Sequence, residues 1–189
     1  GVRGIDGKIK AIRYAREHRV PFFGICLGMQ MAVVEACRNL LHIDNAGSAE
    51  FGGNCTPVIS KMKVWEQDGQ KQIRPDNGDL GGTMRLGAYP CVLQAGSLAA
   101  ANYGNAETIR ERHRHRYEMD ISYESALAEK GLMVSGKSPD GLLPEIVEIP
   151  SHPFYIAVQF HPEFTSRPGH PNPIFQAFVA AALKHGYLV

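Results

Sequence analysis

The sequence predicts an α/β fold, with an open, mostly parallel sheet flanked by helices. A helical pattern, a short apolar run and a second helical pattern follow one another over residues 8–41, which is the spacing of parallel strands joined by helices. A second strong apolar run covers residues 155–160. The 189 residues are 44% hydrophobic and 21% charged, which favours one globular domain with its own core.

The N-terminal elements follow from local patterns. Residues 8–18 form an amphipathic helix whose apolar side carries Ile9, Ile12 and Ala15. The apolar run at residues 20–25 is typical of a buried strand. Apolar side chains then recur at helical spacing over residues 27–41.

The remainder of the chain is less regular. A polar stretch rich in Gly, Asp, Gln and Lys predicts a mobile surface loop at residues 66–82. A short helix is expected at residues 124–130. Six of the 12 prolines fall between positions 150 and 173, so we expect ordered loop there around one strand. The other predicted strands cover residues 57–65, 85–93, 132–134, 146–149 and 155–160. The closing helix, residues 174–183, is expected to bury one face made of Phe175, Phe178, Val179 and Leu183.

Charge and composition exclude several classes of partner. Lys and Arg number 20 and Asp and Glu 19, a net charge of +1, so no global field favours nucleic acid or an anionic membrane. No apolar stretch approaches the roughly 20 residues that span a bilayer. Four cysteines are far fewer than a disulfide scaffold needs. The first residues show no charged segment followed by an apolar one, so nothing in them suggests secretion. We therefore expect a cytoplasmic location, and no Cys/His spacing indicates a metal site.

Cys26 is the candidate nucleophile. The run Gly24-Ile25-Cys26-Leu27-Gly28 lies between a predicted strand and a predicted helix, as in a nucleophile elbow. The sharp turn requires glycine two residues before and two after the nucleophile. The helix N-terminus favours the thiolate, and the Leu27 N–H would face a developing oxyanion. The alternative is that Cys26 is simply a small buried apolar residue.

His161 is the candidate base because it follows the strand at residues 155–160. Active sites gather where parallel strands end, and Cys26 also follows a strand. Glu163 lies two residues further on, where its carboxylate can orient the imidazole. These residues predict a Cys–His–Glu triad.

The motifs GICLGMQ at residues 24–30 and QFHPEF at residues 159–164 resemble those of the class I glutamine amidotransferases. GGTMRLG at residues 81–87, ERHRHRYE at residues 111–118, and GVRG followed by Asp6-Gly7-Lys8 resemble the glutaminase domains of the CTP synthase family. The resemblance covers essentially the whole chain.

The resemblance implies that Cys26 forms a γ-glutamyl thioester, with His161 as its base and Glu163 as the partner of the base. It implies that Glu50 binds the α-ammonium group of L-glutamine and that Arg116 binds its α-carboxylate, by bidentate pairing. The residues that would line the glutamine site are Leu27, Gly28, Met29 and Gln30.

The resemblance also implies a partner domain and a lid. Released ammonia would reach a synthetase domain of the same chain that aminates UTP to CTP with ATP and Mg²⁺, in a homotetramer. The domain itself would need no cofactor. The loop at residues 66–82, with Arg74 and Arg85, would be a lid that responds to GTP.

The basic run at residues 112–116 has a second interpretation, a nucleic-acid patch, which the net charge of +1 disfavours. If the run is extended, its arginines lie on one face, and His113 and His115 lie on the other.

We expect residues 1–189 to be one amidotransferase domain. The Gly-rich turn that supplies part of the family's oxyanion hole would lie before residue 1, and the synthetase domain would also lie outside the chain. Two alternatives stay open. One is another class I amidotransferase or a γ-glutamyl hydrolase-like enzyme, and the other is a non-catalytic regulatory module of the same fold.

Overall fold

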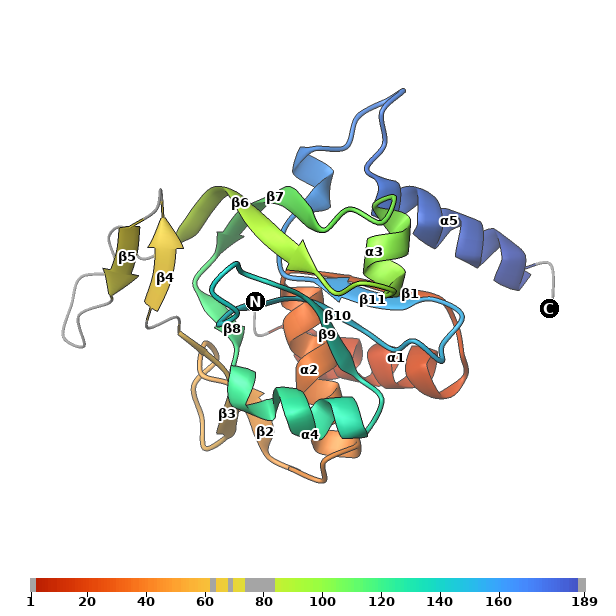
Figure 1. Ribbon diagram of the computed structural model, residues 1–189. Coiled ribbons are helices and arrows are strands. Elements are labelled where there is room, and N and C mark those ends of the chain that lie inside the picture. Colours follow the sequence, from red (N-terminus) through yellow and green to blue (C-terminus); the bar gives the residue numbers. More distant parts are fainter. Residues whose placement is uncertain (1–2, 62–63, 68–69, 74–83, 187–189) are drawn as a thin grey trace.

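The computed structural model describes residues 3–61, 64–67, 70–73 and 84–186 (Figure 1). Its first elements are helix α1 (Ile5–Glu17), strand β1 (Phe22–Ile25) and helix α2 (Leu27–Asn39). They occur in the predicted order. The side chains of Ile9, Ile12 and Ala15 are buried, so the predicted apolar side of α1 is confirmed.

The main sheet has six strands in the order β1-β11-β10-β9-β6-β7. Strand β1 pairs in parallel with β11, with Ile25 opposite Val158. The other four pairings are antiparallel, so the prediction of a mostly parallel sheet is wrong for the described residues. The strands that follow β1 in this sheet are β6 (Arg85–Leu93), β7 (Thr108–His115), β9 (Met133–Lys137), β10 (Pro144–Glu148) and β11 (Tyr155–Val158).

Short connections explain two of the four antiparallel pairs. A parallel neighbour needs a crossover of a dozen or more residues. Only residues 138–143 join β9 to β10, and only residues 149–154 join β10 to β11. Both connections are too short for a crossover, so each strand must turn back beside the one before it.

Smaller elements surround the main sheet. Strands β2 (Ala46–Ser48), β3 (Thr56–Lys61) and β8 (Tyr117–Met119) form a three-stranded sheet, and β4 (Val64–Gln67) pairs with β5 (Gln70–Ile73). The expected loop at residues 66–82 therefore includes part of a hairpin. Arg74 lies outside the described residues. The short helices are α3 (Leu98–Asn102), η1 (Ile121–Tyr123), α4 (Glu124–Glu129) and η2 (Pro162–Phe164).

Alternate residues of β11 face two separate apolar cores. Tyr155 and Ala157 belong to the core that contains α1 and α2. Ile156 and Val158 belong to the core that contains α3 and helix α5 (Pro173–Gly186). This alternation of period two places the sheet between two helical layers, as Figure 1 shows.

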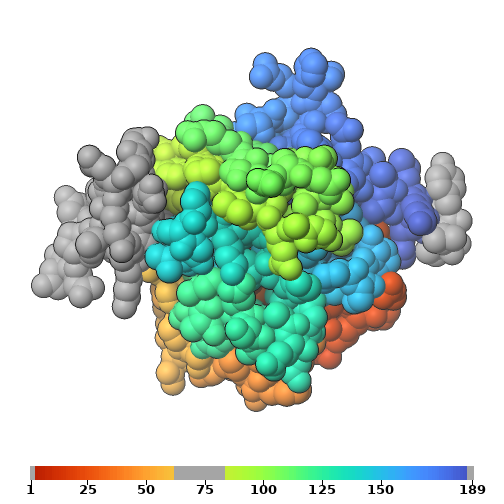
Figure 2. Space-filling view, viewed as in Figure 1, coloured from red at the N-terminus to blue at the C-terminus, as the bar shows by residue number. Residues whose placement is uncertain are grey.

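The packed face of the closing helix agrees only in part with the predicted one. Phe178 packs on the core and the ring of Phe175 lies against that of Phe23, but the other two predicted residues are exposed. Val179 is 53% exposed and Leu183 58%. The packed residues are Ile174, Ala177, Phe178 and Ala181, which follow the i, i+3, i+4, i+7 spacing of one helix face. The prolines before this helix lie in ordered loop, as predicted, and the segment between β11 and α5 projects from the body of the molecule (Figure 2).

Gly24→Ala should destabilise the fold, because a Cβ at Gly24 would lie 2.9 Å from Ala157 Cβ and 2.9 Å from the carbonyl carbon of Gly28. We expect a loss of about 1–3 kcal/mol, as for other overpacked sites, measured by chemical denaturation. Gly28→Ala is the matched control, since a Cβ at Gly28 meets no atom within 4 Å. Equal stability of the two variants would contradict this account.

Candidate active site

Cys26 occupies the turn between β1 and α2. Its backbone has φ 52° and ψ −102°. Residues other than glycine rarely adopt such a positive φ, and this conformation stores strain. The Cys26 N–H donates to the carbonyl of Val158 at 2.7 Å, and the Cys26 carbonyl accepts from the Gln30 N–H at 3.1 Å. The nucleophile elbow predicted from the sequence is therefore present at the end of the parallel strand pair.

The two glycines of the elbow differ in whether a larger side chain would fit. Gly24 lies against Ala157 and the backbone of Gly28, so no larger residue fits there. The collision expected at Gly28 is absent, because the space beside its Cα is open. The steric argument for glycine therefore applies to the strand side of the turn only.

The surroundings of Cys26 favour the neutral thiol. Burial raises the pKa of the Cys26 thiol to about 11, and the negative charges of Glu118, Glu163 and Glu50 act in the same direction, while a hydrogen bond from the Leu27 N–H opposes them. A thiol in this state needs a base beside it before it can act as a nucleophile.

His161 and Glu163 form the predicted pair. His161 Nδ1 lies 2.6 Å from Glu163 Oε1, and the His161 N–H donates to the carbonyl of Arg112 at 2.8 Å. Among the described residues, His161 Nε2 is buried without a hydrogen-bond partner. Since β1 and β11 are parallel and in register, their ends bring Cys26 and His161 to the same edge of the sheet. The free imidazole nitrogen is suited to receive the thiol proton.

A cavity of about 270 Å³ opens at the thiol. It brings together five residues predicted for the site, namely Cys26, Leu27, Gln30, Glu50 and Arg116. Phe51, Met84, Arg114, His115 and Tyr117 complete its lining. Gly28 is not part of the lining. Met29 is not either, because its side chain is fully buried in the core around α1 and α2.

The cavity lining carries the carboxylate of Glu50 and the guanidinium groups of Arg114 and Arg116. Glu50 is exposed beside it, and its N–H donates to Ser48 Oγ at 3.2 Å. Arg116 Nε is buried and has no hydrogen-bond partner among the described residues, so it can donate to a ligand. A cavity with a carboxylate, a guanidinium group and a thiol suits a zwitterionic amino acid.

The sequence model of the family "Glutamine amidotransferase class-I" matches residues 1–181 of this chain. The chain belongs to this family. The CTP synthases of Zymomonas mobilis and Beijerinckia indica are 59% and 57% identical to the amidotransferase over all 189 residues. Those residues make up only 35% of each relative, so the chain spans about a third of the length of these curated relatives.

A solved glutaminase domain of a CTP synthase, from Trypanosoma brucei with bound acivicin, is 39% identical to the amidotransferase, with a TM-score of 0.84. The match covers 97% of this chain and 68% of that one. A putative GMP synthase protein from Thermoplasma acidophilum is 17% identical, with a TM-score of 0.55 and coverage of 97% and 68%, and shares the fold alone.

The described part of the amidotransferase contains no helix that is long and apolar enough to cross a membrane. No three His, Cys, Asp or Glu side chains among the described residues are grouped to hold a metal ion. All four cysteines are free thiols.

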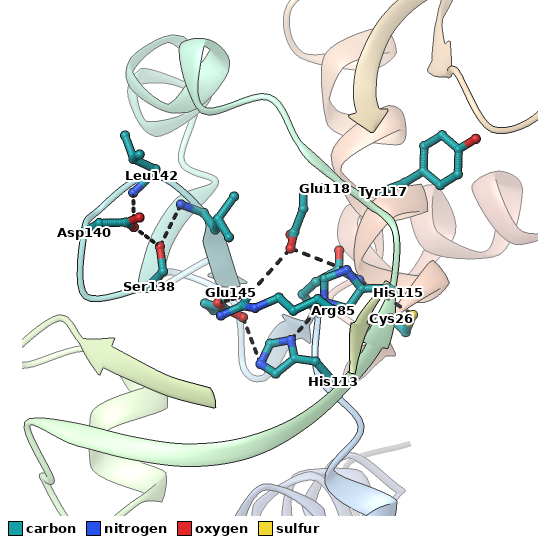
Figure 3. A network of polar contacts seen from close by, with 12 residues as sticks. Cys26, Arg85, His113, His115, Tyr117, Glu118, Ser138, Asp140, Leu142 and Glu145 are labelled. Carbon is teal, nitrogen blue, oxygen red and sulfur yellow. Dashed lines mark hydrogen bonds and ion pairs between the residues drawn. The ribbon is translucent and has the colours of Figure 1, made fainter. Parts of the chain in front are cut away.

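The amidotransferase also contains a buried polar network that the sequence did not reveal (Figure 3). Arg85, only 2% exposed, forms an ion pair with Glu145, and its Nη1 lies 3.5 Å from Glu118 Oε1. His113 lies 3.3 Å from Glu145 and His115 lies 3.4 Å from Glu118. His113 Nδ1 and His115 Nε2 are 2.9 Å apart. His115 also lines the cavity, so the network lies directly behind the site.

Arg85 is the one cation opposite two buried carboxylates in this network. Burial raises the pKa of Glu118 and of Glu145, and Arg85 opposes both shifts. Burial, with the positive charge of Arg85, lowers the pKa of His115 to about 3. Arg85 is therefore an interior residue among those described, and its charge faces glutamates from two other strands.

The predicted alternation over residues 112–116 is confirmed for β7, in which His113 and His115 are buried while Arg112 and Arg114 are exposed. The inward position of two histidines beside Glu118 was the sequence signal for the network. The alternation alone does not identify the partners of these histidines, because Arg85 and Glu145 lie 60 residues apart in the sequence.

Arg85→Met should destabilise the amidotransferase by about 3–5 kcal/mol, the usual cost of removing one partner from a buried ion pair. The measurement is chemical denaturation. Arg110→Met, at an exposed position of β7, is the matched control and should change little. Adding Glu145→Gln to Arg85→Met should restore part of the loss. Additive losses in the double variant would contradict the pairing.

Proposed function

We propose that this chain hydrolyses L-glutamine through a γ-glutamyl thioester on Cys26. The observation that carries the proposal is the cavity in which Cys26, Glu50 and Arg116 meet. Membership of the class I glutamine amidotransferases supports it. Glu50 would bind the α-ammonium group of glutamine, and Arg116 would bind its α-carboxylate. The walls at Leu27 and Gln30 would hold the side chain.

The proposed chemistry uses only groups at this edge of the sheet. His161 Nε2 takes the proton of Cys26, and the sulfur attacks the amide carbon of the substrate. The Leu27 N–H donates to the oxyanion. His161 then gives its proton to the departing nitrogen, so ammonia leaves and the thioester remains. Water, deprotonated by His161, hydrolyses the thioester to glutamate and restores the thiol, while Glu163 holds the imidazole in the required tautomer.

We further propose that the full-length protein uses this ammonia to aminate UTP to CTP. The support is the identity of 59% and 57% with two CTP synthases over the whole of this chain. In this proposal a synthetase domain supplies the ATP and Mg²⁺ chemistry, GTP activates the glutaminase, the enzyme is a homotetramer and the location is cytoplasmic. The same relatives disfavour a γ-glutamyl hydrolase-like enzyme, and the Cys26, His161 and Glu163 arrangement disfavours a non-catalytic module.

Cys26→Ala should abolish glutamine-dependent CTP formation in the full-length protein, because no other group at the site can form the thioester. CTP formation from added ammonia should persist at the wild-type rate. Both rates are measured by the appearance of CTP. Cys55→Ala, which changes a thiol outside this cavity, is the control and should leave both rates unchanged. Loss of ammonia-dependent CTP formation in Cys26→Ala would contradict the proposed division of labour.

Arg116→Ala should raise the KM for glutamine by at least tenfold and lower kcat less, because the guanidinium binds a part of the substrate that does not react. Steady-state glutaminase kinetics measure both constants. Arg110→Ala removes an exposed arginine from the neighbouring strand β7 and should leave KM unchanged. An unchanged KM in Arg116→Ala would remove this residue from the substrate site.

A further inference from the structure

Gln159 is a fully buried amide beside the nucleophile. It directly follows β11, where its N–H donates to the carbonyl of Glu145 at 2.8 Å. Its Nε2 lies 3.6 Å from the sulfur of Cys26. The chemistry described above gives this side chain no role. A buried amide held against a reactive sulfur therefore needs an explanation.

The orientation of the Gln159 amide follows from its neighbours. The backbone carbonyl of Tyr117 can only accept a hydrogen bond, and it lies 2.9 Å from Nε2 of Gln30. The same Gln30 nitrogen donates to Gln159 Oε1 at 3.3 Å. Since the Gln159 oxygen faces Gln30, its nitrogen must face Cys26. The direction of each donor is thus determined by a group whose chemistry is unambiguous.

We propose that Gln159 is a positioning residue that donates an amide hydrogen bond to the Cys26 thiolate, and that Gln30 and the Tyr117 carbonyl hold it in that orientation. We call these three groups the amide relay. The inference rests on the proposed function, because it assigns Gln159 to the nucleophile of that reaction.

The electrostatic setting shows why a second donor matters. Burial and three nearby carboxylates disfavour a charged sulfur, and the Leu27 N–H is one donor that offsets them. A hydrogen bond to the charged form favours that form, so the Gln159 amide acts in the same direction. Glu50, Glu118 and Glu163 lie close enough to raise the pKa of the Cys26 thiol. The ionisable groups Arg114, His115, Arg116 and Tyr117 line the same cavity, and His161 lies at the same edge of the sheet. None of these described side chains forms a hydrogen bond to the Cys26 sulfur, so none can take over the donor role of the Gln159 amide.

The amide relay also joins the sulfur to the substrate cavity. Gln30 and Tyr117 both line the cavity, and Tyr117 follows Arg116 directly. Arg116, the proposed carboxylate-binding residue, directly precedes strand β8, and Tyr117, the first residue of β8, supplies the first acceptor of the relay. A change at Gln159 should lower kcat for glutamine hydrolysis while changing KM little, since the amide lies behind the sulfur and not in the cavity lining.

The test is the pH dependence of Cys26 alkylation by iodoacetamide in the full-length protein, which follows the thiolate population. Mass spectrometry of the Cys26 peptide separates it from Cys37, Cys55 and Cys91. In Gln159→Met, which keeps the side-chain length and removes the donor, the midpoint should rise by about one pH unit, a roughly tenfold slower alkylation at neutral pH. Gln159→Glu, which offers only acceptors when ionised, should raise it at least as much.

Two further variants make the result decisive. Gln30→Met breaks the relay without touching the sulfur and should raise the midpoint by a smaller amount. Tyr155→Phe changes a buried group of β11 away from the sulfur and should leave it unchanged. An unchanged midpoint in both Gln159 variants, or an equal rise in Tyr155→Phe, would overturn the proposal. Failure of the proposed function would instead appear as glutaminase activity that survives in Cys26→Ala.

Discussion

The parallel pairing of β1 with β11 is the constraint on which the site depends. It is the one parallel pairing in the described six-stranded sheet, and the Cys26 N–H bond to Val158 continues it into the elbow. The nucleophile therefore begins its turn at the level where β11 ends, and Gln159 and His161 follow within three residues of Val158. The thiol, its amide donor and its base reach one edge because two neighbouring strands end together.

A second constraint is the buried charge behind the cavity. Glu118 and Glu145 lie on different strands, and Arg85 neutralises their surroundings from a third. Such a network is costly to desolvate and contributes little net stability when intact, but it becomes strongly unfavourable when one member is lost. It therefore restricts how β6, β8 and β10 can be arranged. His115 belongs both to the network and to the cavity wall, so the network also restricts the shape of the cavity.

The proposed reaction needs both its reacting groups and its substrate to be held in place, and different parts of the fold do this. The strand ends hold the reacting groups, while Glu50, which follows β2, and Arg116, which lies between β7 and β8, would hold the two ends of the substrate. The amide relay is the direct link between them, since it begins at the Tyr117 carbonyl and ends at the sulfur. A thiol whose pKa is raised by burial is suited to such a site, because it becomes a nucleophile only when its base and donors are all in place.

The sequence by itself determined the local features. The G-x-C-x-G turn, the His161/Glu163 pair, the inward face of α1 and the full extent of β6 were predictable, because each depends on sterics or periodicity over a few residues. Only the tertiary structure decided the mixed sheet, the packed face of α5, the interior position of Arg85 and the orientation of Gln159. These depend on partners far away in the chain: Arg85 and Glu145 are 60 residues apart, and Gln159 and Cys26 are 133. No local pattern encodes such distances, since strand order and burial choose the partners.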